Sequence, residues 1–308
     1  MAPGERSVGQ TRGMAHRLST ITAPDGRALG VAQWGAPDGS PLFSLHGTPG
    51  SRFGRHPDEA ALQRAGLRVV TYDRPGYGVS ARLPGRRVVD CAADVTAIAD
   101  ELGIDRFAVT GGSGGGPHSL AVAARLGDRV ERAECVVGAA PFDAEGLDWW
   151  AGMDPQNVRE FHWALEGEQV LHEHLARLAE QDLERIAKDP SKILSDDWQL
   201  ADADREKLSR PDLQVVFVEA MRAAYAAGVW GWVDDDLALL TGWGFDLDEI
   251  HVPVTIRYGT QDVLAPAGHG AWLAAHVPGA KVVVNPEAGH LSDPDTRIEE
   301  LRELVAAG

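Results

Sequence analysis

The chain has 308 residues, of which 44% are hydrophobic and 24% are charged, and its formal net charge is -17. This size and composition are typical of a globular protein with a large core, built as one elaborated domain or as two small ones. Because nucleic acids and anionic membranes repel an acidic surface, the charge argues against both as partners.

The N-terminal residues 1–16 lack the apolar core of a secretory signal, and we expect them to form a flexible tail. Met14 is an alternative start to Met1. No stretch reaches the roughly eighteen consecutive apolar residues that a membrane span needs. Cys91 and Cys135 are expected to be buried thiols, since two cysteines alone cannot build a metal site. These features favour a cytoplasmic protein.

Short β runs alternate with helical segments through the first part of the chain. An Asp-Gly turn between the first two β runs predicts a hairpin. The β runs cover residues 18–22, 28–34, 41–45, 67–72, 107–110 and 134–137. The helical segments between them cover residues 57–65, 88–102 and 118–125. Such alternation predicts a largely parallel sheet with helices on both faces.

The alternation stops at residues 141–245, where only helical segments such as 157–165, 169–187 and 213–227 are predicted. Acidic residues outnumber basic ones there by 22 to 9. Strand and helix patterns then resume at residues 252–258, 267–275, 280–284 and 294–305. We therefore expect an α/β core, residues 17–140 and 246–308, with residues 141–245 inserted as a helical cap.

Five glycines surround a single serine in Gly111-Gly112-Ser113-Gly114-Gly115-Gly116, between a β run and a helix. The pattern G-x-S-x-G in this context is typical of a nucleophile elbow, in which neighbouring glycines make room for the strained backbone of the serine. A flexible linker is disfavoured because both flanks are structured. A phosphate-binding loop is disfavoured because neither of its glycine patterns is present. Ser113 is the predicted nucleophile.

A serine nucleophile needs a base and an acid that orients the base. Asp262 and His290 each follow a β run, in loops at the carboxyl ends of strands, where open α/β sheets bind ligands. We expect His290 to be the general base and then acid, and Asp262 to hold its imidazole. The structural alternatives are a helix cap for Asp262 and a surface position for His290.

Other acids and histidines are weaker candidates. His46 is expected to shape its own loop, as are Asp73 and Arg74. Three consecutive acids of the insert are rivals for the acid role, but we expect them to form a solvated face: Asp234, Asp235 and Asp236. Two further histidines have no acid in a matching position: His118 and His269.

With Ser113, Asp262 and His290 in this order, the chain resembles the α/β-hydrolase-fold serine hydrolases over residues 18–305. The resemblance implies a mostly parallel eight-stranded sheet with a helical cap after the sixth strand. The sequence His46-Gly47-Thr48-Pro49 is similar to the H-G-x-P motif, whose third position donates its amide to an oxyanion. The oxyanion hole is therefore expected to consist of the Thr48 and Gly114 N–H groups, the latter aided by a helix dipole. No metal or organic cofactor is expected.

The leading hypothesis is hydrolysis of a small-molecule ester, lactone or amide through an acyl-enzyme. Serine as nucleophile argues against haloalkane dehalogenases and epoxide hydrolases, which use aspartate. An aminopeptidase similar to the proline iminopeptidases is an alternative, although Thr48 and Gly114 depart from their pattern. A carbon–carbon bond hydrolase and a non-catalytic ligand-binding protein also stay open. The substrate and the oligomeric state stay undetermined.

Two features bear on selectivity. Because Gly114 and Gly115 have no side chains, we expect open space beside Ser113, so that selectivity for the acyl group comes mainly from the insert. The insert holds seven tryptophans, which either fill its core or in part line a substrate pocket: Trp149, Trp150, Trp163, Trp198, Trp230, Trp232 and Trp243.

Overall fold

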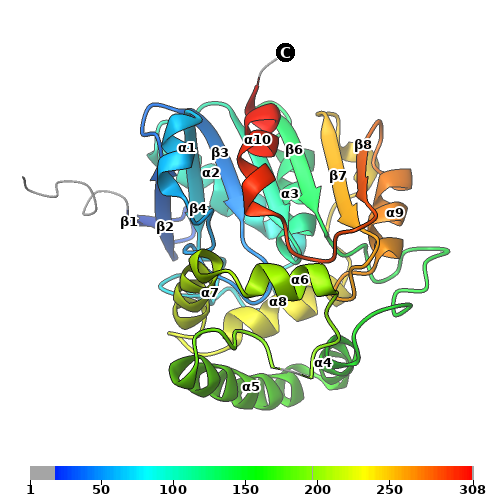
Figure 1. The fold of residues 1–308 in the computed structure, drawn as a ribbon. Helices are drawn as coiled ribbons and strands as arrows, with labels where there is room; N and C mark the ends of the chain where they lie inside the picture. The colour runs from blue at the N-terminus through cyan, green and yellow to red at the C-terminus, as the bar shows by residue number, and fades with distance from the viewer. Residues whose placement is uncertain (1–17, 196, 307–308) are drawn as a thin grey trace, which may run out of the picture.

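The computed structural model describes residues 18–195 and 197–306, so the tail predicted for residues 1–16 lies outside the described residues. The described strands form one eight-stranded sheet in the order β1-β2-β4-β3-β5-β6-β7-β8 (Figure 1). Strand β2 pairs antiparallel with β1 and β4, and the other neighbours are parallel. The strands are β1 (Leu18–Thr22), β2 (Ala28–Gly35), β3 (Ser40–Leu45), β4 (Leu67–Tyr72), β5 (Phe107–Gly112), β6 (Val130–Val136), β7 (Val254–Gly259) and β8 (Lys281–Asn285). The mostly parallel eight-stranded sheet expected from the sequence is confirmed.

Helices cover both faces of the sheet. One core cluster buries Val95, Leu120 and Leu273, from α2 (Cys91–Glu101), α3 (Gly115–Arg125) and α9 (Ala267–His276). A second cluster buries leucines of α1 (Glu59–Arg64) and α10 (Pro294–Val305) against β2 and β4. Because both faces are covered, a central strand such as β5 is apolar and buried almost throughout.

Local signals set the ends of several helices. Asp58 accepts a hydrogen bond from Ala61 N at 2.9 Å, so α1 begins at Glu59, later than the pattern predicted. The segment predicted as one helix at 88–102 begins with a 3-10 turn, η1 (Val88–Asp90), ahead of α2. A second turn, η2 (Leu247–Glu249), precedes β7. Helix α10 has the predicted bounds, with Asp293 as its cap.

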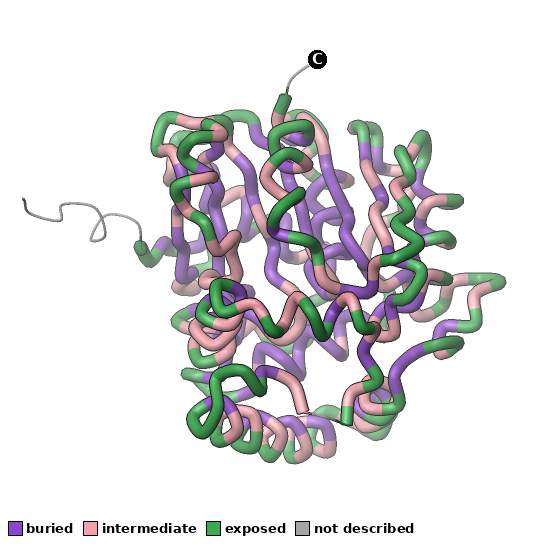
Figure 2. Tube along the Cα trace, in the orientation of Figure 1, coloured by how far each residue is buried: buried purple, intermediate pink, exposed green. Residues whose placement is uncertain are grey.

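Between β6 and β7, the described residues form five α-helices: α4 (Pro155–Glu166), α5 (Glu168–Lys188), α6 (Asp202–Leu208), α7 (Pro211–Ala224) and α8 (Trp230–Leu240). Figure 1 shows them at the end of the sheet to which the strand arrows point, with α5 farthest from it. Helix α8 is mostly buried, and Figure 2 shows buried chain continuing from the strands into this layer. Loops at the carboxyl ends of the strands therefore lie between the sheet and these helices.

No helix within the described ranges is both long and apolar enough to cross a membrane. Cys91 and Cys135 are buried free thiols, as expected. Three of the seven tryptophans of residues 141–245, Trp149, Trp232 and Trp243, are buried among core clusters.

Candidate active site

Ser113 lies at the apex of the turn between β5 and α3. Its φ is 55°, in the left-handed region that a residue with a side chain seldom adopts. The Ser113 N–H donates to the Val136 carbonyl at 2.9 Å, which ties the turn to β6. A Cβ on Gly111 would lie 3.1 Å from Gly116 N and closer still to the Gly115 carbonyl oxygen, so the start of α3 can approach only a glycine. The turn therefore has the geometry predicted for an elbow.

Asp262 and His290 lie together in the loops after β7 and β8. His290 Nδ1 and Asp262 Oδ2 are 2.8 Å apart, and both side chains are buried. The other carboxylate oxygen of Asp262, Oδ1, accepts the N–H groups of Leu264 and Ala265 at 2.8 and 3.0 Å. Because a carboxylate can only accept, Nδ1 must carry the proton, which leaves Nε2 as a free acceptor.

The surroundings of His290 favour its protonated form. Burial lowers the pKa of His290, but the charge and hydrogen bond of Asp262 and the charge of Asp204 outweigh it. The pKa of His290 is therefore raised above its ordinary value. A base with this property readily takes a proton from a hydroxyl.

The loop after β3 lies against Ser113. A Cβ on Gly47 would lie 3.3 Å from Ser113 Cβ and 3.8 Å from its Oγ. The next residue, Thr48, is packed against Gly114: a Cβ on Gly114 would lie 3.2 Å from Thr48 N. The structure thus brings the two predicted oxyanion residues together beside Ser113. Among the described residues, no hydrogen bond joins Ser113 Oγ to His290, a contact that is often long before substrate binds.

Residues 40–292 match a family model described as alpha/beta hydrolase fold. The chain belongs to this family. It is 28% identical over 244 residues to the pimeloyl-(acyl-carrier protein) methyl ester esterase of Nitrosomonas europaea, a match that covers 75% of this chain and 81% of that protein. It is 27% identical over 282 residues to a probable proline iminopeptidase of Leptolyngbya boryana, covering 84% and 83%.

A solved structure of a hydrolase from Pseudomonas aeruginosa PA01 has a similar fold, with a TM-score of 0.67. The identity to that protein is 22%, and the match covers 95% of this chain and all of that one, 100%. At this identity the likeness shows the fold alone. The resemblance to the α/β hydrolases that the sequence indicated is confirmed.

The prediction that Gly114 and Gly115 leave open space beside Ser113 in this α/β hydrolase is wrong. A Cβ on Gly114 would lie 2.9 Å from Thr48 Cβ and closer still to its Oγ1. The space next to Gly114 is thus filled by the threonine side chain. A Cβ on Gly115 would meet the backbone at the end of β3, 2.9 Å from the Leu45 carbonyl carbon. Both glycines are required by close packing.

We expect Gly114→Ala to lower kcat about 100-fold and to cost about 1–3 kcal/mol of unfolding free energy. The added methyl group must displace Thr48, whose Oγ1 is held by Asp235 at 2.7 Å, and with it the Thr48 N–H. Ester hydrolysis kinetics and thermal unfolding measure the two effects. Gly112→Ala is the matched control, because a Cβ at Gly112 meets nothing within 4 Å. Equal kcat for Gly114→Ala and the control would contradict the packing argument.

The three consecutive acids of α8 do not form the solvated face that we expected. Asp234, Asp235 and Asp236 are 2%, 0% and 1% exposed. Asp234 pairs with Arg82 at 2.9 Å, and Asp235 pairs with two arginines. Burial, and then the nearby Glu160, hold the pKa of Asp236 well above its usual range. A run of three acidic residues predicts a solvated surface, because the arginines that pair with these carboxylates lie far away in the sequence.

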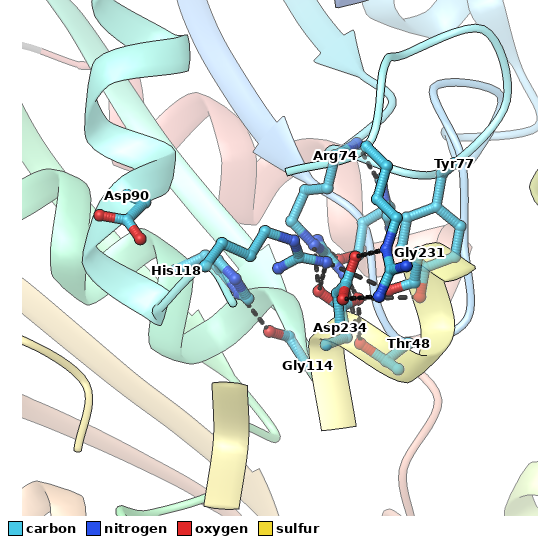
Figure 3. Close-up of polar contacts among 12 residues, drawn as sticks. Thr48, Arg74, Tyr77, Asp90, Gly114, His118, Gly231 and Asp234 are labelled. Atoms are coloured by element: carbon cyan, nitrogen blue, oxygen red, sulfur yellow. Dashed lines mark hydrogen bonds and ion pairs between the residues drawn. The ribbon is translucent and has the colours of Figure 1, made fainter. Parts of the chain in front are cut away.

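Asp235 contacts the predicted oxyanion residue Thr48, a role that no motif of the sequence indicates. Its Oδ2 accepts from Thr48 Oγ1 at 2.7 Å and from Tyr77 Oη at 2.9 Å. Both oxygens pair with guanidinium groups, of Arg74 at 2.6 Å and of Arg86 at 2.6 Å. Burial raises the pKa of Asp235, but these two arginines outweigh it and hold that pKa well below the usual range. Figure 3 shows Arg74, Tyr77 and Thr48 converging on this point.

The other three candidate histidines form hydrogen bonds with backbone groups. His46 Nδ1 lies 2.7 Å from the Gly47 carbonyl oxygen, and its Nε2 accepts from Arg74 N at 3.1 Å, which matches the loop-shaping role expected for it. His118 Nδ1 donates to the Gly114 carbonyl at 2.7 Å (Figure 3), and burial lowers the pKa of His118 to about 3. His269 bridges Ala140 N and the Trp149 carbonyl. In the described part of the chain, no acid binds any of these three imidazoles as Asp262 binds His290, which agrees with the expectation for His118 and His269.

The two loop residues after β4, Asp73 and Arg74, contact other segments as well as their own loop, in which Asp73 Oδ2 accepts the Val79 N–H at 3.2 Å, as expected. Asp73 pairs with Arg52 at 2.8 Å. The Arg74 guanidinium donates to the carbonyls of His46 and Gly47 as well as to Asp235. Within the described part of the chain, no three His, Cys, Asp or Glu side chains are grouped so that they could hold a metal ion.

Proposed function

We propose that this α/β hydrolase cleaves a carboxylic ester of a small molecule through an acyl-enzyme, with Ser113 as nucleophile, His290 as base and Asp262 as the orienting acid. The observation that carries the proposal is the buried His290–Asp262 pair at 2.8 Å, which in the neutral imidazole places the proton on Nδ1 and leaves Nε2 as the base. The left-handed backbone of Ser113 supports it, because this conformation is kept only where surroundings enforce it.

In the first half-reaction, Ser113 Oγ attacks the substrate carbonyl carbon and its proton passes to His290 Nε2. The N–H groups of Thr48 and Gly114 donate to the oxygen on which negative charge develops. The carbon–oxygen bond to the leaving group then breaks, and the leaving alkoxide takes the proton from His290. In the second half-reaction His290 takes a proton from water, the resulting hydroxide attacks the acyl carbon, and Ser113 leaves with that proton.

Residues 141–245 serve in this proposal as a cap over the site, since α6 and α8 lie at the carboxyl edge of the sheet (Figure 1). The choice of an ester follows the similarity to an enzyme named as a methyl ester esterase. Lactones and amides have the same carbonyl chemistry and belong to the same proposal. The similarity to a probable proline iminopeptidase makes an aminopeptidase the second candidate.

A fluorophosphonate probe tests the nucleophile. Its phosphorus forms a bond to Ser113 Oγ, fluoride leaves, and the proton of the hydroxyl is released. We expect peptide mass mapping to locate the label on Ser113 in the wild type and no label in Ser113→Ala. A folded wild-type protein that is not labelled would favour a non-catalytic ligand-binding protein.

A substrate panel then separates the reaction classes. We expect p-nitrophenyl esters of graded acyl length to turn over faster than proline p-nitroanilide. The reverse order would favour the aminopeptidase. A labelled protein that cleaves neither class would favour a carbon–carbon bond hydrolase with the same nucleophile.

A further inference from the structure

Asp204 lies on α6, far from His290 in the sequence but in direct contact with its loop. Its Oδ2 accepts the His290 N–H at 2.7 Å, and its Oδ1 accepts the Leu291 N–H at 2.8 Å. The Asp204 residue is 1% exposed. A buried carboxylate that accepts two backbone N–H groups fixes the path of the chain it binds, because leaving either donor unpaired is costly.

The loop is shaped to admit this carboxylate. A Cβ on Gly289 would lie 2.9 Å from Asp204 Oδ1 and closer still to Oδ2, so a side chain at this position would displace the carboxylate. The same helix also binds a carbonyl group of this loop, because Lys207 Nζ donates to the Leu291 carbonyl oxygen at 2.6 Å. Helix α6 therefore binds the backbone N–H groups of His290 and Leu291 and the carbonyl group of Leu291.

Asp204 also acts on the imidazole electrically. Its charge is one of the causes that raise the pKa of His290, after Asp262. The charged groups that act on this imidazole are Asp262, in the loop after β7, and Asp204, on α6. Removal of the Asp204 charge therefore lowers the pKa of His290.

Asp235 of α8 makes corresponding contacts with the loop after β3. Through Thr48 Oγ1 at 2.7 Å it holds the residue whose N–H is the proposed oxyanion donor. Asp235 also pairs with Arg74, whose guanidinium donates to the carbonyl of Gly47 at 2.9 Å. It therefore acts on Gly47, the residue before Thr48, as well. Figure 3 shows Thr48 and Arg74 in this region, with dashed lines for the polar contacts among the residues drawn.

We propose that Asp204 and Asp235 are positioning residues, which set the backbone of His290 and of Thr48 respectively for the reaction. The inference rests on the proposed function, because it assigns to both residues an effect on that reaction. Helices α6 and α8 then contribute to the reaction by positioning, since their buried carboxylates hold the two loops that flank Ser113.

Asp204→Asn is the first test. The amide keeps one acceptor but turns an NH2 group toward the second N–H, and it removes the charge. We expect kcat to fall about 100-fold, the effect of displacing a catalytic group by about 1 Å, with KM nearly unchanged. We also expect the acid limb of the kcat/KM profile to move to lower pH, because His290 loses its proton more easily. Asp202→Asn, an exposed position on the same helix, is the matched control.

A histidine NMR titration separates failure of this inference from failure of the proposed function, since it needs no substrate. A lower pKa of His290 in Asp204→Asn supports the contact even if no ester is cleaved. A wild type that cleaves esters, together with an Asp204→Asn variant whose kcat, acid limb and His290 titration all match the control, would overturn the role of Asp204.

Thr48→Val and Thr48→Ser test Asp235 without leaving its two arginine partners unpaired. Valine removes the hydroxyl group that binds Asp235 but keeps the backbone N–H, and serine keeps both. We expect kcat of Thr48→Val to lie about tenfold below that of Thr48→Ser, with little difference in KM. Equal kcat in the wild type and both variants would overturn the role of Asp235, whether or not Asp204→Asn folds.

Discussion

Alanine in place of Ser113 is expected to lower kcat for the best ester about 10⁶-fold, because without Oγ no acyl-enzyme can form. The residual rate comes from water attacking a substrate that the oxyanion donors still bind. The fold should survive, since alanine meets the same left-handed backbone at φ 55° that serine already adopts. Initial rates at saturating substrate measure the loss, and thermal unfolding checks the fold.

Ser44→Ala, in the half-buried part of β3, is the control for loss of a hydroxyl near the sheet edge. It should keep wild-type kcat. If Ser113→Ala retained kcat within tenfold of that control, Ser113 would not be the nucleophile and the acyl-enzyme would have to be abandoned.

Asparagine in place of Asp262 is expected to lower kcat about 10⁴-fold through the wrong imidazole tautomer. At Asp262, Oδ1 accepts two N–H groups, of Leu264 and Ala265. The amide oxygen of asparagine must take that place, so its NH2 group points at His290 Nδ1. Nδ1 then accepts a hydrogen bond, and the proton moves to Nε2, which can no longer act as base.

The measurement is kcat for the same ester, with the rate of fluorophosphonate labelling as a second readout, and both should fall. Asp248→Asn, on the exposed surface of the η2 turn, should change neither. A kcat of Asp262→Asn close to that control would show that Asp262 does not set the tautomer, and the helix-cap alternative for Asp262 would take its place.

The features that could be predicted from the sequence are those determined by residues close to one another in the chain. The elbow is one of them, because the glycines around Ser113 are adjacent to it. Alternation of β runs and helices predicted the parallel sheet in the same way, and chain order then located Asp262 and His290 after the last two strands. Their pairing at 2.8 Å spans only 28 positions and two adjacent parallel strands.

Contacts between distant segments were not predictable. The hydroxyl of Thr48 and the carboxylate of Asp235 are 187 positions apart, and Asp204 binds His290 across 86. No periodicity or motif links such pairs, and a run of three aspartates on a helix is ordinarily solvated.

The sequence by itself thus determined the sheet, the elbow and the order of the candidate triad, because these follow from local patterns and from the rule that parallel strands end at one edge. Only the tertiary structure decided the burial of Asp204 and Asp235. Their charges are tolerated inside the molecule because backbone N–H groups and guanidinium groups from distant segments converge on them.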